Sequence, residues 1–343
     1  MDEQLQSIQH IRVMLYHPVT IGGSAQPLSL DGNIFLAPVA GYSDRSFRSI
    51  CVDCGASFTY TEMVSAEALV RRSDKTHVIM RRAQNERLYA VQIFGSNPET
   101  ISRAVAIVLD ATSCSCLDIN CGCPVPKIVK TGAGSALIRN PDKLHNVVRA
   151  AVAAAHGKVP VTVKIRSGWD AHEMTWKEAA AAALDAGVSA ITIHPRTRAQ
   201  GYEGTADWNV IASLVEFVAG RIPVFGSGDL FTPEDARDML LQTGCDAVMF
   251  ARGAMGNPFI FTETTALLKT GSYSSVNSAA RIAAGFKELE LLASDVGEEH
   301  ACKEMRKRFC AYTKGIAGGA ELRNRLVHAA TIAEYNDILH AYT

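Results

Sequence analysis

The chain has 343 residues, of which 48% are hydrophobic and 20% are charged, an ordinary composition for a protein with a sizeable core. Its formal net charge of -1 gives no sign of a polyanionic partner, so any nucleic-acid binding has to depend on local basic patches. Nine cysteines are an odd number without the density of a disulfide scaffold, and no apolar run reaches the roughly 18 residues of a membrane span. We therefore expect a cytoplasmic protein with reduced thiols and no membrane association.

The first part of the chain predicts a lead-in and then a repeated strand–helix pattern. Residues 1–18 predict a poorly ordered or short helical lead-in, and residues 19–30, with Gly22-Gly23 inside them, predict a small hairpin. Eight short apolar segments follow, each expected to be a strand: 34–37, 58–61, 89–94, 117–120, 161–165, 190–194, 224–225 and 247–250. Helical patterns lie between them, including 98–109, 143–155, 176–186 and 233–242.

The spacing of these strands predicts a barrel. It averages about 30 residues, the size of one strand–helix unit. Eight parallel strands with intervening helices close into a (β/α)8 TIM barrel, which we place in residues 1–271. The alternative is a doubly wound open sheet, which would leave strands surplus. That alternative is disfavoured because no Gly-x-Gly-x-x-Gly motif follows the first strand.

After residue 271 the pattern changes to helices without strands. Helical periodicity at 279–294, 298–312, 321–329 and 332–341 predicts a smaller helical domain over residues 272–343. Its second segment carries a basic and aromatic cluster, formed by Lys303, Arg306, Lys307, Arg308, Phe309 and Tyr312. Such a helix suits an RNA backbone, although a solvated charged face over a packed aromatic pair gives the same pattern.

Polar or glycine-containing groups follow nearly every predicted strand. They are residues 38–41, Glu62, Gln92, Asn120 with Cys123, Lys164 with Arg166, His194 with Arg196, residues 226–229 and residues 251–253. In barrels of this kind function collects at the carboxyl ends of the strands. A complete ring of such groups therefore predicts an active-site rim.

The last two strand ends predict a phosphate site. Gly226-Ser227-Gly228-Asp229 and Ala251-Arg252-Gly253 offer exposed backbone N–H groups, and Arg252 offers a charge. Glycine after a strand can also mark a plain turn, but two adjacent loops of this kind favour a phosphate-bearing ligand.

Three side chains on the rim have several possible roles. Lys164 lies inside an apolar strand, so it either forms a Schiff base, as in barrel aldolases, or provides a fixed cation near the N1/O2 edge of a flavin. Gln92 could bind the O4/N3 edge of a flavin or cap a strand end. His194 could be a base, a phosphate ligand or a hydrogen-bonded structural histidine.

Cys123 follows a buried strand in a Gly-Cys-Pro loop, with Lys127 four residues further on. It can donate a proton only while it remains a thiol, and a nearby cation such as Lys127 would favour the thiolate instead. The residues alone therefore leave both acid and nucleophile open. Other closely spaced cysteines raise the question of zinc or an iron–sulfur cluster, but their spacing is not that of a zinc knuckle, and we expect no metal.

Taken together, these segments resemble the tRNA-dihydrouridine synthases, most closely their bacterial B-type branch. The matching segments are 37–48, 91–95, 120–124, 132–137, 164–169, 194–200 and 252–258, with Met305-Arg306-Lys307 and residues 312–315 in the helical part. The resemblance covers about residues 19–335.

The resemblance implies FMN in the barrel mouth, NADPH as the reductant, and hydride transfer from the flavin to C6 of a uridine flipped out of folded tRNA. Cys123 would then protonate C5. It also implies a role for each rim residue: Pro38, Val39 and Ala40 along the isoalloxazine, Gln92 and Lys164 at its polar edge, His194 near the flavin, and Ser227, Gly228, Asp229, Ala251 and Arg252 at the phosphate. The substrate contacts would be Asn120, Lys127, Arg196, Lys307 and Arg308. We expect a monomer.

Three residues depart from the family pattern. Ser227 stands where Asn is usual, Ala251 where Gly is usual, and Cys121 where a larger apolar residue is common. The alternatives to this function are another FMN-dependent barrel oxidoreductase similar to dihydroorotate dehydrogenase, a lysine aldolase, and an RNA-binding module on an inactive barrel.

Overall fold

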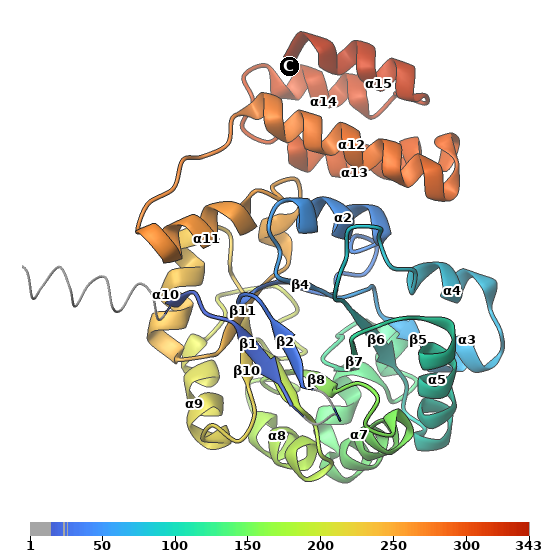
Figure 1. The fold of residues 1–343 in the computed structure, drawn as a ribbon, viewed down its shortest axis with the longest axis vertical. Helices are drawn as coiled ribbons and strands as arrows, with labels where there is room; N and C mark the ends of the chain where they lie inside the picture. The colour runs from blue at the N-terminus through green and yellow to red at the C-terminus, as the bar shows by residue number, and fades with distance from the viewer. Residues whose placement is uncertain (1–14, 23–24, 26, 343) are drawn as a thin grey trace, which may run out of the picture.

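The computed structural model describes residues 15–22, 25 and 27–342 (Figure 1). The predicted lead-in lies outside the described residues except for 15–18, and so do positions 23, 24 and 26 of the predicted hairpin. Strands β1 (Val19–Ile21) and β2 (Leu28–Leu30) pair antiparallel. Their buried side chains pack against the aromatic residues at the bottom of the sheet described next, so this ribbon covers one end of it.

Nine parallel strands form one curled sheet. They are β3 (Ile34–Leu36), β4 (Phe58–Thr59), β5 (Val64–Ser65), β6 (Ala90–Phe94), β7 (Cys116–Cys121), β8 (Val161–Arg166), β9 (Ala190–His194), β10 (Val224–Ser227) and β11 (Ala247–Phe250). The order is β4-β3-β11-β10-β9-β8-β7-β6-β5. A parallel bridge from Tyr60 to Ala90 joins the segment after β4 to β6, so β4 and β5 together occupy the second position of a closed barrel. The predicted (β/α)8 barrel is therefore confirmed.

The interior of the barrel has an apolar bottom and a polar top. Phe35, Phe58 and Phe225 fill the bottom, with the rings of Phe35 and Phe225 edge to face at 5.1 Å. Because side chains alternate along a strand, Asp118 and Asn120 of β7 point to the same interior as Cys116, further toward the carboxyl end. The polar groups thus gather where the predicted rim lies.

Helices surround the barrel as the alternating pattern predicts. They are α2 (Arg45–Asp53), α3 (Ala66–Val70), α4 (Asp74–Ile79), α5 (Pro98–Ala111), α6 (Pro126–Val129), α7 (Pro141–Ala155), α8 (Trp176–Asp185), α9 (Trp208–Val218), α10 (Pro233–Thr243) and α11 (Ile260–Thr270), with 3-10 turns η1 (Gly134–Arg139) and η2 (Arg252–Ala254). Several of these helices begin where a capping side chain is followed by a proline in the first turn. Thr232 and Asp235, for example, form a capping box at the start of α10.

The remaining helices form a bundle over one side of the barrel. They are α12 (Ser278–Val296), α13 (Glu298–Tyr312), α14 (Gly319–Leu326) and α15 (Ile332–Leu339), followed by η3 (His340–Tyr342). The bundle has its own core, in which the rings of Phe309 and Tyr335 stack at 5.1 Å. Figure 1 shows it in orange and red, with α12 and α13 above α2.

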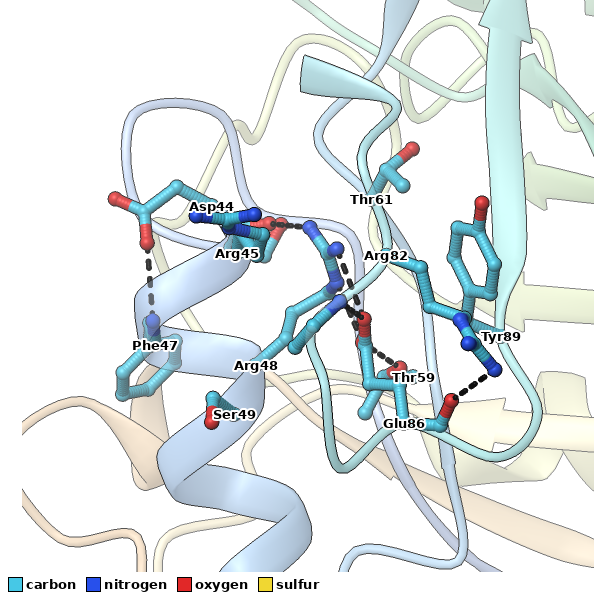
Figure 2. Close-up of polar contacts among 12 residues, drawn as sticks. Asp44, Arg45, Phe47, Arg48, Ser49, Thr59, Thr61, Arg82, Glu86 and Tyr89 are labelled. Carbon is cyan, nitrogen blue, oxygen red and sulfur yellow. Dashed lines mark hydrogen bonds and ion pairs between the residues drawn. The ribbon is translucent and has the colours of Figure 1, made fainter. Parts of the chain in front are cut away.

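A fully buried ion pair ties α2 to the barrel (Figure 2). Arg48 donates to both carboxylate oxygens of Glu86, at 2.7 and 3.1 Å, and also to the carbonyl oxygens of Ser43 and Arg81. The Thr59 hydroxyl donates to Glu86 at 2.7 Å. All three guanidinium nitrogens of Arg48 and both carboxylate oxygens of Glu86 therefore have hydrogen-bond partners. Such full pairing is the condition for burying two charges.

Among the described residues, no helix is long and apolar enough to cross a membrane. No three His, Cys, Asp or Glu side chains in that part of the chain come together as a metal ion would need, and the nine cysteines are free thiols.

Candidate active site

A cavity of about 480 Å³ opens at the carboxyl ends of the barrel strands, a size typical of small-molecule sites. It brings together the predicted catalytic residue and all the predicted cofactor residues. From the predicted set its lining includes Pro38, Val39, Ala40, Gln92, Asn120, Cys123, Lys164, His194, Ser227, Gly228, Asp229, Ala251 and Arg252. Lys127, Arg196, Lys307 and Arg308 are not among the lining residues.

The loop that carries Cys123 is held on both sides. The Asn120 side-chain oxygen accepts from the backbone N–H groups of Gly122 and Cys123, at 3.2 and 2.9 Å. Ser135 donates both its backbone N–H and its hydroxyl to the Cys123 carbonyl, at 3.0 and 2.9 Å. Arg166 donates to the Gly122 carbonyl at 2.9 Å. The thiol is therefore presented by a loop with little freedom.

Cys123 is half-buried, and burial raises the pKa of its thiol above the ordinary value. The cations that partly offset this rise are Arg166 and Lys164. Lys127, expected from the sequence to favour the thiolate, is exposed on α6 and is not one of them. Cys123 thus keeps its proton at neutral pH, as a proton donor must.

Lys164 points from β8 into the cavity. Burial and the charge of Arg166 lower the pKa of Lys164 to about 8, against the opposing effect of Asp118. Most of the lysine is still an ammonium ion at neutral pH. It can act there as a fixed cation beside a bound group.

His194 is neutral in this setting. Burial lowers the pKa of His194 well below its ordinary value, and Lys164, Arg166, Arg196 and Arg252 add to the effect. Its Nε2 atom is buried and has no hydrogen-bond partner among the residues that the structure describes. A buried polar atom without a partner on a cavity wall fits a site whose ligand supplies the missing hydrogen bond.

The two loops at the predicted phosphate end approach closely. A Cβ atom on Gly253 would lie 2.2 Å from the Leu230 carbonyl oxygen, so only glycine fits there. Gly228 has φ of +123°, again a conformation for glycine. The Ser227 hydroxyl donates to the Met249 carbonyl at 3.1 Å, so its proton is engaged by the protein. The Arg252 side chain remains 36% exposed at this end of the cavity.

Arg196, predicted to contact RNA or the target base, is engaged within the protein. Its side chain is 2% exposed and forms two hydrogen bonds to Asp229, at 2.8 and 2.7 Å. Asp229 also accepts from the Ala206 N–H at 2.8 Å and from Arg252 at 3.2 Å. Arg196 therefore holds Asp229 in place, and Asp229 in turn holds Arg252.

Arg308, predicted to contact RNA, is likewise engaged within the protein. Its guanidinium is 2% exposed and is bound by two carboxylates, Glu288 of α12 and Asp44 at the start of α2. The Tyr312 hydroxyl donates to Glu288 at 2.6 Å. Arg308 thus joins the helical bundle to the barrel.

Lys307, its neighbour on α13, lies at the surface. Its side chain is half exposed and pairs with Glu304 at 2.7 Å. Its ammonium nitrogen lies close to Gly41: a Cβ atom added to this glycine would be 3.8 Å from the nitrogen. Lys307 therefore sits beside the first rim loop, next to the cavity lining at residues 38–40.

Several residues of the site were not singled out from the sequence. Met63 and Tyr202 line the cavity, and Asp118 lies fully buried below it. Arg166, which the sequence marks only as part of the rim, lines the cavity and holds the Cys123 loop. The alternation along β7 was a usable signal for Asp118, because it puts this residue on the same face as Asn120.

Comparisons with known proteins match one family over most of the chain. The family model described as dihydrouridine synthase (Dus) matches residues 35–342. A probable tRNA-dihydrouridine synthase of Treponema pallidum is 56% identical over 330 residues, covering 95% of this chain and 96% of the relative. The tRNA-dihydrouridine synthase B of Proteus vulgaris is 36% identical over 310 residues, covering 90% and 94%.

Solved structures with low sequence identity share the fold. DHODH of Eimeria tenella in complex with ferulenol has a TM-score of 0.53 at 15% identity, covering 72% of this chain and 82% of that one. Histamine dehydrogenase of a Rhizobium species has a TM-score of 0.58 at 13% identity, covering 82% and 51%. At such identities the likeness shows the barrel fold alone.

Proposed function

This chain belongs to the dihydrouridine synthase family, a family of oxidoreductases, and on that premise we propose that it reduces the C5=C6 bond of uridines in tRNA with NADPH through a bound FMN. The observation that carries the proposal is the position of Cys123. A thiol with a raised pKa lies in the same cavity as a lysine cation and a neutral histidine.

The residues of the cavity fit FMN. The ammonium of Lys164 and the unpartnered Nε2 of His194 suit the polar parts of the ring system. Arg252 and the backbone of Gly228 and Asp229 suit the phosphate, while the carboxylate of Asp229 is held by two arginines and faces them. When bound, FMN supplies the hydride that NADPH provides.

Cys123 is proposed as the general acid that protonates C5 of the uracil. Its loop is fixed by Asn120 and Ser135, so the thiol is presented in one place. Its raised pKa keeps the proton available until the base needs it. Asn120, which also lines the cavity, is proposed to face the target base.

We assign FMN binding and catalysis to residues 1–271 and tRNA binding to residues 272–343. Supporting this division, the helical bundle has its own hydrophobic core and meets the barrel at the rim loop beside Lys307. A tRNA held there would lie next to the cavity mouth. Lys127, exposed on α6 close to the catalytic loop, remains a proposed RNA contact.

Formation of dihydrouridine in tRNA tests the proposed function directly. Purified protein should bind FMN, become yellow, and form dihydrouridine in unmodified tRNA when NADPH is added. Mapping dihydrouridine in tRNA from cells with and without the protein then identifies the positions. A protein that cannot be reconstituted with FMN, or tRNA without dihydrouridine under these conditions, would overturn the proposal.

FMN affinity should depend on the charge of Lys164. Since its pKa is about 8, FMN binding should weaken by about tenfold as the pH rises from 7 to 9, because the ammonium that attracts the cofactor is lost. The cofactor phosphate is already dianionic in this range, its second pKa being about 6. Quenching of flavin fluorescence measures the dissociation constant. In Lys164→Met the pH dependence should disappear, and an unchanged profile in that variant would contradict the role of the lysine.

Lys307 should contribute one phosphate contact. Lys307→Ala should weaken tRNA binding severalfold and reduce the slope of log affinity against log salt by about 0.7–0.9. The matched control is Lys303→Ala, one turn earlier on the same helix and paired with Glu299, which should have less effect. Filter binding at several salt concentrations measures both slopes, and equal slopes for Lys307→Ala and the parent protein would move the RNA contact elsewhere.

A further inference from the structure

Asp118 is a buried carboxylate that the proposed chemistry does not use. It lies on the interior face of β7, is 0% exposed, and is not part of the cavity lining. One oxygen accepts from Gln92 Nε2 at 2.6 Å and the other from the Thr162 hydroxyl at 2.6 Å. These partners lie directly across β6 and β8 in the register of the sheet.

A chain of hydrogen bonds leads from this carboxylate to the catalytic loop. Gln92 Oε1 accepts from Asn120 Nδ2 at 2.8 Å. Asn120 Oδ1 then accepts from the N–H of Cys123 at 2.9 Å. Every link joins neighbouring strands or the loop after β7, so no flexible segment interrupts it.

The two ends of the chain decide the orientation of both amides. A carboxylate can only accept hydrogen bonds and a backbone N–H can only donate them. Gln92 must therefore turn its NH2 group to Asp118 and its oxygen to Asn120, and Asn120 must turn its oxygen to the loop. Without the acceptor at position 118, Gln92 could flip, and Asn120 would lose the partner that holds its NH2 group.

We propose that Asp118 is a positioning residue that fixes the Cys123 loop through Gln92 and Asn120. It does not touch the reacting atoms. Burial raises the pKa of Asp118 to about 6, and the hydrogen bonds from Gln92 and Thr162 and the charge of Lys164 oppose the rise, so the group is mostly a carboxylate at neutral pH. The other near groups, Cys116 and Tyr60, are an uncharged thiol and phenol. Only the turnover measurement below depends on the function proposed above.

Two substitutions separate hydrogen bonding from packing. Asp118→Leu has nearly the same shape but no acceptor, whereas Asp118→Asn keeps an oxygen for Gln92. In flavin-free protein, the rate of Cys123 alkylation by iodoacetamide, followed by peptide mass spectrometry, should rise about fivefold or more in Asp118→Leu as the loop loosens. In holoenzyme, kcat should fall about tenfold or more with KM for tRNA within about twofold. Asp118→Asn should stay within about twofold in both measurements.

Thr162→Val is the control for a merely structural effect. It removes the other hydrogen bond to Asp118 but leaves the link to Gln92, so Cys123 alkylation should stay within about twofold of the parent protein. If Asp118→Leu does not fold, Asp118→Ser replaces it, because its shorter side chain keeps a polar group but does not reach Gln92.

The outcomes are separable. The inference would be overturned if Asp118→Leu or Asp118→Ser kept both the alkylation rate and kcat within twofold of the parent protein. It would also be overturned if Asp118→Asn changed both measurements as much as Asp118→Leu does. A parent protein that makes no dihydrouridine would count against the proposed function alone, because the alkylation rates of the flavin-free proteins would still decide the role of Asp118.

Discussion

Replacing Cys123 with alanine is expected to lower dihydrouridine formation by about 10²–10⁴-fold, the usual contribution of a general acid. Within the described part of the cavity lining it is the side chain whose raised pKa keeps a thiol proton available at neutral pH. Reduction of the flavin by NADPH should remain nearly intact, because that half of the reaction needs no proton from Cys123. Single-turnover kinetics with FMN absorbance and product analysis measures the two halves separately.

Cys121 provides a matched control on the same strand end. Its side chain is fully buried and belongs to the core between the barrel and the surrounding helices, so it points away from the cavity. Burial raises the pKa of its thiol strongly, which leaves it unreactive. Cys121→Ala should therefore keep product formation within about twofold. A normal product yield in Cys123→Ala, or an equal loss in both variants, would rule out the acid role of Cys123.

The barrel was predictable because its strands are short apolar runs at regular intervals. The predicted strands 190–194 and 247–250 coincide with β9 and β11. The sequence predicts the second strand as one piece, 58–61, but β4 ends at Thr59 and β5 begins at Val64. Between them Glu62 turns to accept a hydrogen bond from the Gly41 N–H. That partner lies 21 residues away, and no local pattern reveals it.

The cavity lining was predictable for a related reason. Parallel strands bring their carboxyl ends to one edge, so residues far apart in the sequence can be grouped without knowing their contacts. Charge pairing follows no such rule. Arg196 meets Asp229, 33 residues further on, and Arg308 meets Asp44, 264 residues earlier. The sequence shows the charge of both arginines but hides these carboxylate partners, so it predicts RNA contacts without revealing the ion pairs.

Replacing Arg308 with methionine is expected to lower the free energy of unfolding by about 3–5 kcal/mol, the cost of leaving buried carboxylates without their cation. Glu288 is fully buried and Asp44 partly so, and both depend on this guanidinium. Lys307→Met, at the preceding and exposed position, should change stability by no more than about 0.5 kcal/mol. Urea unfolding followed by circular dichroism measures both variants.

The loss of unfolding free energy in Arg308→Met should also depend on pH. In the parent protein burial works to raise the pKa of Asp44, but Arg308 holds it below the ordinary value, while burial raises the pKa of Glu288 despite Arg308. Without the arginine both carboxyls should titrate above their unfolded values, so the folded variant binds more protons than the unfolded chain and loses stability as pH rises. The deficit should therefore be larger at pH 8 than at pH 5. Adding Glu288→Gln to Arg308→Met should recover part of it, because one buried charge is removed. A deficit that is equal at both pH values and unchanged by Glu288→Gln would show that lost packing, and not the unpaired carboxylates, destabilises the junction between bundle and barrel.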